Sequence, residues 1–218
     1  MTHNHPETQE RRTGSSTWWT PRRTKMAGLC GFAGGLGSLG VISPLIGHTG
    51  AEIGLGAVSL LYPVWHLLLA VALLAADAKY GSRYGRSGRT VSLFLALSLL
   101  CYAALTLVLL MIRTVPGDVL LFGVLTGGLY MAIRLFGSCY GIVLWQRADS
   151  DRRTRADRLT AALFAISFPA VFVLGLLTQF GFPSELIDSP FYLAFIALSY
   201  TLWTNDTDAS QANSGENL

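Results

Sequence analysis

The sequence predicts an all-α, polytopic integral membrane protein with six transmembrane helices and both termini in the cytoplasm. Of its 218 residues, 51% are hydrophobic and only 13% are charged, whereas a soluble domain carries about 25% charged residues. Its apolar runs are mostly about 20 residues long, the length at which a helix crosses the hydrocarbon of a bilayer. The expected helices are 26–47, 53–76, 91–112, 119–146, 159–180 and 184–203. They form one transmembrane domain, 26–203, which leaves no room for a soluble domain, and an acidic tail, 204–218, is expected to be disordered.

The placement of basic residues indicates the orientation. Every lysine and arginine except Arg113 and Arg134 lies in the head, 1–25, or in the links 77–90 and 147–158. Basic segments stay on the cytoplasmic side of the plasma membrane, so both termini are expected inside the cell. The net charge of +3 reflects this topology and contact with anionic lipid, and it does not indicate a nucleic-acid partner.

Helix one, 26–47, follows arginines and tryptophans that are typical of an interfacial anchor. Small residues recur along it at helical spacing: Gly28, Gly31 and Gly35. Such a face lets helices approach closely in lipid, within one chain, in a homo-oligomer or with other membrane subunits. The letters from Gly35 to Gly40 also match a dinucleotide-binding pattern, but no strand precedes them, so helix packing is the favoured interpretation.

Helix two, 53–76, carries a proline and a histidine near its middle. Pro63 removes a backbone hydrogen bond and is expected to kink the helix. Tyr62 and His66 belong to a face that is polar or small along its whole length. A lone histidine on an apolar helix is more often a hydrogen-bonded packing residue than a ligand, so both interpretations stay open. Helix three, 91–112, is the most uniformly apolar run.

Helix four, 119–146, carries Arg134 near its middle, and a charge at that depth is costly. The stripe that contains this arginine otherwise consists of glycine and tyrosine: Gly123, Gly127, Tyr130, Gly137 and Gly141. The opposite stripe is fully apolar, so Arg134 is expected to face protein. It could be the hub of a buried hydrogen-bond network, or it could bind a ligand or ion.

Helix six, 184–203, is short. The part that follows Pro190 measures about 21 Å as a helix, less than the thickness of the hydrocarbon. Either the helix bends at this proline, or it begins inside the membrane with Asp188 or Ser189 as its cap. Counted from the inner interface, Arg134 lies about 16 Å deep and Asp188 about 22 Å deep, an offset that an arginine side chain can span. Asp188 is therefore the predicted partner of Arg134, because an unpaired buried charge is costly.

The sequence favours a protein that is not an enzyme and needs no cofactor or metal. No histidine follows His66, which excludes a rhomboid-type pairing of a serine with a histidine on a later helix. Paired metal ligands of the HExxH type are absent from the sequence. The three cysteines lie within apolar runs and predict no disulfide: Cys30, Cys101 and Cys139.

The leading hypothesis is a small permease, or the membrane subunit of one. Helices two, four and six would line a polar path for a small solute, and this path would contain His66, Arg134 and Asp188, with Tyr62 and Tyr130 beside them. Arg134 and His66 could frame a site for an anion. The alternative is a non-transporting assembly or sensor component that packs against partner proteins through its glycine-rich faces.

Overall fold

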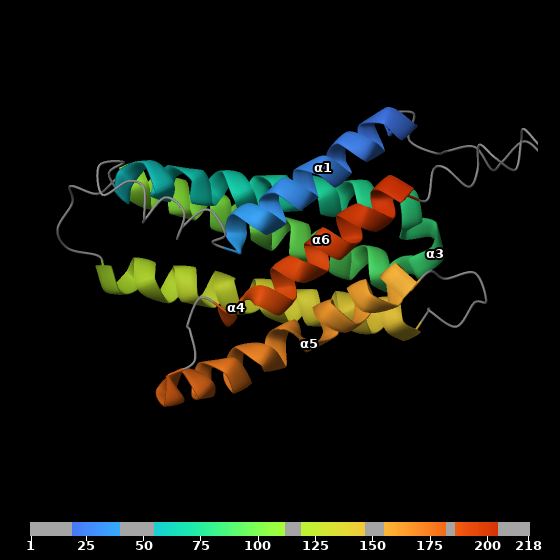
Figure 1. The fold of residues 1–218 in the computed structure, drawn as a ribbon. Coiled ribbons are helices and arrows are strands. Elements are labelled where there is room, and N and C mark those ends of the chain that lie inside the picture. Colours follow the sequence, from blue (N-terminus) through green and yellow to red (C-terminus); the bar gives the residue numbers. More distant parts are fainter. Residues whose placement is uncertain (1–18, 40–54, 112–118, 147–154, 182–185, 205–218) are drawn as a thin grey trace, which may run out of the picture.

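The computed structural model describes residues 19–39, 55–111, 119–146, 155–181 and 186–204, and over these ranges the fold is all-α, as predicted. The elements are α1 (Pro21–Ser38), α3 (Leu55–Met111), α4 (Val119–Gln146), α5 (Arg155–Leu177), the 3-10 turn η1 (Thr178–Phe180) and α6 (Ser189–Thr204) (Figure 1). The head before residue 19, the expected end of helix one after residue 39 and the tail from residue 205 lie outside the described residues.

Element α3 consists of two helical arms that reverse direction at Gly85. This residue has φ 65° and ψ −171°, a conformation that glycine adopts without the steric cost that a Cβ would add. The sequence predicted two helices joined by a link at 77–90, and the prediction that the link separates the helices is wrong. The link is itself helical on both sides of Gly85, so the two helices form a hairpin with a single non-helical residue at its turn (Figure 1).

Four helical segments are long and apolar enough to cross a membrane. They are Leu61–Gly81, Tyr84–Leu109, Leu121–Gln146 and Arg155–Phe180. Large apolar side chains are exposed along them, among them Leu97, Val124 and Val173. Since contact with lipid allows such apolar exposure, these segments indicate a membrane protein.

The helices pack so that α6 lies between α1 and α5, while α4 packs on both α3 and α5 (Figure 1). The start of α1, the bend of α3, the end of α4, the start of α5 and the end of α6 all lie at one end of the bundle. This end carries the described basic residues of the segments that the sequence assigns to the cytoplasm, among them Lys25, Arg86 and Arg155, and we refer to it as the basic end. Two side chains of α3 fasten α6 there: Lys79 Nζ donates to the carbonyl of Leu202 (3.5 Å) and the Tyr80 hydroxyl donates to that of Thr201 (3.2 Å).

The glycines of α1 are packing positions, as predicted. A Cβ on Gly28 would lie 3.2 Å from the carbonyl oxygen of Ser199, and one on Gly31 would lie 2.5 Å from the Cβ of Ala72. A Cβ on Gly35 would lie 2.7 Å from a side-chain carbon of Ile196. These glycines therefore allow α1 to approach α6 and α3 closely.

The glycine stripe of α4 packs over only half its length. A Cβ on Gly141 would collide with the backbone of α5 at Ala165, and one on Gly137 would lie 2.8 Å from the ring of Phe191. A Cβ on Gly123 or Gly127 would meet none of the described atoms within 4 Å. The predicted packing of these last two glycines is therefore not found among the described residues, because the described parts of α1 and α6 do not extend alongside this half of α4 (Figure 1).

Candidate functional site

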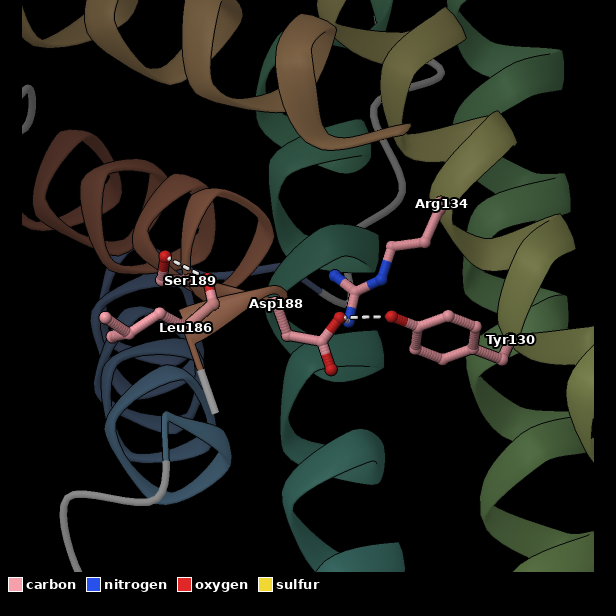
Figure 2. Close-up of polar contacts among 5 residues, drawn as sticks. All are labelled: Tyr130, Arg134, Leu186, Asp188 and Ser189. Atoms are coloured by element: carbon pink, nitrogen blue, oxygen red, sulfur yellow. Dashed lines mark hydrogen bonds and ion pairs between the residues drawn. The ribbon is translucent and has the colours of Figure 1, made fainter. Parts of the chain in front are cut away.

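The candidate site is centred on Arg134, whose side chain is almost completely buried in the middle of α4. Its Nη2 lies 2.7 Å from the Oδ1 of Asp188, and the hydroxyl of Tyr130 donates to the same oxygen. Figure 2 shows the carboxylate of Asp188 pointing from the start of α6 toward both side chains of α4. The predicted pairing of Arg134 with Asp188 is thus confirmed, and Tyr130, one helical turn before the arginine, joins it.

Three aromatic rings surround the guanidinium of Arg134. Its Cζ lies 4.1 Å from the ring centroid of Phe191 and 5.0 Å from those of Tyr130 and Tyr192. The faces of aromatic rings attract cations, and this attraction strengthens where water is excluded. The rings and the carboxylate together offset the cost of holding this charge inside the bundle.

The position of Asp188 follows from where α6 begins. The helix begins at Ser189, directly after Asp188, and the Tyr192 N–H donates to the Asp188 carbonyl (3.3 Å). The Ser189 hydroxyl donates to the carbonyl of Leu186 (2.7 Å), in the turn before the helix. Of the two alternatives left open by the sequence, the helix therefore takes the one in which it begins at Ser189. Its 16 residues span about 24 Å, so it leaves Asp188 beside the middle of α4.

The guanidinium has hydrogen-bonding capacity left over. Its Nε and Nη1 are buried and have no hydrogen-bond partner among the described residues. A buried donor that lacks a partner is costly, and an anion could accept from either of these nitrogens. Asp188 retains about a quarter of its exposure, so the site is not fully closed.

His66 and Tyr62 lie in a neighbouring aromatic cluster. His66 is buried, and its Nδ1 lies 3.0 Å from the carbonyl of Tyr62, so this nitrogen carries the proton and donates it. The His66 ring lies 4.9 Å from those of Tyr62 and Tyr102 and 6.4 Å from that of Tyr192. Because Tyr192 contacts both His66 and Arg134, it connects the two groups. The predicted site residues therefore form two adjoining sets: Arg134, Asp188 and Tyr130 in one, and His66 and Tyr62 in the other.

Sequence reasoning missed Phe191, Tyr192 and Tyr102. The first two follow Asp188 by three and four residues, so a helix that begins at Ser189 places them on the same side as Asp188. A helix that begins at Ser189 therefore predicts that these two rings lie near Arg134. Tyr102 comes from the second arm of α3, and nothing in the sequence connects it with the other residues.

The site combines one cation, one carboxylate and several aromatic rings. Among the residues that the structure describes, no three histidine, cysteine or acidic side chains gather as metal ligands. The pair of Arg134 and Asp188 is close to neutral overall. Comparison of the chain with protein-family models, curated proteins and solved structures finds no match. Its function therefore has to be inferred from these side chains.

Proposed function

We propose that the chain is a six-span protein of the plasma membrane, with both termini in the cytoplasm, that acts as a small permease or as the membrane subunit of one. Its solute would be a small anion held by Arg134. The single observation that carries the proposal is that this arginine is buried in the bundle with two donor nitrogens unpartnered. An ionised side chain inside a membrane domain usually marks a solute or ion pathway.

The surroundings of Arg134 support this role. Helix α6 begins at Asp188–Ser189 beside the middle of α4, and helices that begin inside the membrane form the solute sites of many transporters. An anion that accepts from Nε or Nη1 would share the guanidinium with Asp188, which is paired with Nη2. The Asp188 carboxylate now pairs with the guanidinium and accepts from the Tyr130 hydroxyl, so its negative charge would oppose the anion and favour its release.

The six-span topology is supported by the arrangement of helix ends. The four apolar segments account for four crossings, and α1 and α6 would supply the other two. The described part of the chain starts and finishes at the basic end (Figure 1), as an even number of crossings requires. Basic segments remain in the cytoplasm, which gives the proposed orientation.

Anion binding to the detergent-solubilised protein tests the proposal. A panel of inorganic and carboxylate anions is added, and the melting temperature is measured. A ligand at 100 times its Kd stabilises the folded state by about 2.7 kcal/mol. We expect at least one anion to raise the melting temperature of the wild type, and none to raise that of Arg134→Gln. Uptake of that anion into proteoliposomes should disappear in the same variant.

The control is Arg158→Gln, which removes an exposed arginine at the start of α5 and should leave binding and uptake unchanged. The proposal is wrong if Arg134→Gln merely lowers thermal stability while every anion response persists.

A non-transporting assembly component is the second candidate, and one observation favours it. Gly123, Gly127 and Gly128 of α4 are exposed, and a Cβ on any of them would meet no described atom within 4 Å. A helix of a partner protein could pack there closely. Gly127→Leu should then dissociate a complex that is detectable by size-exclusion chromatography with light scattering. A strictly monomeric wild type with no co-purifying partner would reject this candidate.

A further inference from the structure

An apolar groove runs along the outer surface of the bundle near the basic end. Helix α6 forms its floor, and α1 and α5, which both pack on α6, form its walls (Figure 1). The groove has a volume of about 720 Å³ and is lined almost wholly by apolar atoms. The hydroxyl of Ser199, one of the lining residues, donates to the carbonyl of Phe195 within its own helix. The groove therefore offers an occupant dispersion contacts rather than hydrogen bonds.

The groove has the depth of one membrane leaflet. Its floor extends from Leu193 to Trp203, which is about 15 Å along a helix. This equals half of the hydrocarbon thickness of about 30 Å. Trp203, half-exposed at the end of the floor, is the residue type that marks a membrane interface. An acyl chain that entered at this tryptophan would reach the inner end of the groove.

Basic side chains stand where the two walls reach the membrane surface. Lys25 precedes Gly28 by three residues and Leu29 by four, so it lies on the same side of α1 as these lining residues. Arg155 precedes the lining residue Leu159 by four residues on α5. Both α1 and α5 also begin at this end, and helix N-termini attract phosphate groups. The first turn of α5 also contains an acidic residue, Asp157. It follows Arg155 by two residues and therefore points to nearly the opposite side of the helix.

We propose that this groove is a binding site for an anionic phospholipid of the leaflet at the basic end. The acyl chains would lie on α6 between the two walls, and the headgroup phosphate would lie between Lys25 and Arg155. A second copy of the chain is a poorer occupant, because two such rims brought together would place like charges against each other. The site is separate from Arg134 and does not depend on the proposed transport activity.

The test compares lipids added to the delipidated protein in an uncharged detergent. Dioleoylphosphatidylglycerol should raise the melting temperature more than dioleoylphosphatidylcholine does, and sodium phosphate alone should have no effect. In the double variant Lys25→Ala/Arg155→Ala, binding of phosphatidylglycerol should weaken about 25-fold, from about fivefold for each basic residue at an anionic surface. Arg86→Ala removes an exposed arginine beside the bend of α3, a helix that does not line the groove, so it should bind like the wild type.

A second variant tests the groove itself. Ala197 lies in the floor, and Ala197→Trp should fill the groove and abolish the response to phosphatidylglycerol while leaving the lipid-free melting temperature unchanged. Equal responses to the two lipids, or an undiminished response in the double variant, would overturn the proposal. So would a wild-type dimer that Ala197→Trp converts to a monomer, since the occupant would then be a second copy of the chain.

Discussion

Arg134 holds a full positive charge at a position with about 1% exposure. Desolvation of such a charge costs several kcal/mol, and an ion pair offsets that cost only where its geometry is good. Here a carboxylate at 2.7 Å and a ring face at 4.1 Å from the guanidinium carbon provide such geometry. The pair is therefore essential to the fold around it even if it also binds a solute.

Removal of either partner leaves the other as an uncompensated charge. We expect Asp188→Asn to destabilise the protein by about 3 kcal/mol, near the lower end of the range for broken buried pairs because Asp188 keeps a quarter of its exposure. Arg134→Gln should cost a similar amount. The double variant should cost clearly less than the two single variants together, which thermal melting in a double-mutant cycle measures. Strict additivity would show that the pair is not energetically coupled.

Gly137 permits the contact between Arg134 and Phe191. A Cβ there would lie 2.8 Å from the ring of Phe191, the ring that is closest to the guanidinium. We expect Gly137→Ala to displace this ring and to lower stability by about 1–3 kcal/mol, as overpacking does in protein cores. Gly127→Ala is the matched control on the same helix, because its Cβ would meet no described atom within 4 Å. It should be neutral or slightly stabilising in the same melting assay, since alanine favours helix over glycine.

At the scale of the element, Ser138 of α4 supplies hydrogen bonds to the backbone of α5 where a proline interrupts that helix. Pro169 lies within α5 and cannot donate to the carbonyl of Ala165. The hydroxyl of Ser138, on α4, lies 2.9 Å from that carbonyl, and it also accepts from the N–H of Phe168 (2.9 Å). Inside a membrane every backbone group needs such a partner. Ser138 therefore allows a proline to lie in the middle of a membrane-spanning helix.

Ser138→Ala should leave both backbone groups without their partner and lower stability by about 1–3 kcal/mol. Ser98→Ala is the control, because the Ser98 hydroxyl is also nearly buried but donates only to Phe94 of its own helix (2.8 Å). That carbonyl lies in an unbroken helical stretch, so the loss should be much smaller. Equal melting temperatures for the two variants would contradict the role of Ser138.

At the scale of the whole molecule, the proposed topology can be tested by cysteine labelling. The native cysteines, Cys30, Cys101 and Cys139, are free and would first be replaced by alanine. A membrane-impermeant maleimide applied to intact cells should then label Thr114→Cys, in the link that we assign to the outside. It should label Ser87→Cys, beside the bend of α3, only after the membrane is permeabilised. The reverse pattern would show that the basic end faces outward.

Much of the fold could be predicted because length and hydropathy dominate in a membrane. The boundaries of α4 agree with the expected 119–146, since polar links enclose an apolar run. The helical structure of the link 77–90 was not predicted, because hydropathy marks where apolar contact ends, whereas the helix continues through polar residues until a glycine with positive φ reverses it.

The candidate site could also be predicted only in part. The sequence by itself determined that Arg134 faces protein and that Asp188 lies within its reach, because helical spacing and rise depend only on the backbone. Only the tertiary structure decided that α6 begins at Ser189, which brings Phe191 and Tyr192 to the guanidinium of Arg134. It also decided that Tyr102 packs on His66. Likewise, only the structure shows that no described residue covers Gly123 or Gly127. These facts depend on how far each helix extends beside its neighbours. That is set by packing between segments distant in the chain, which the periodicity of one segment does not encode.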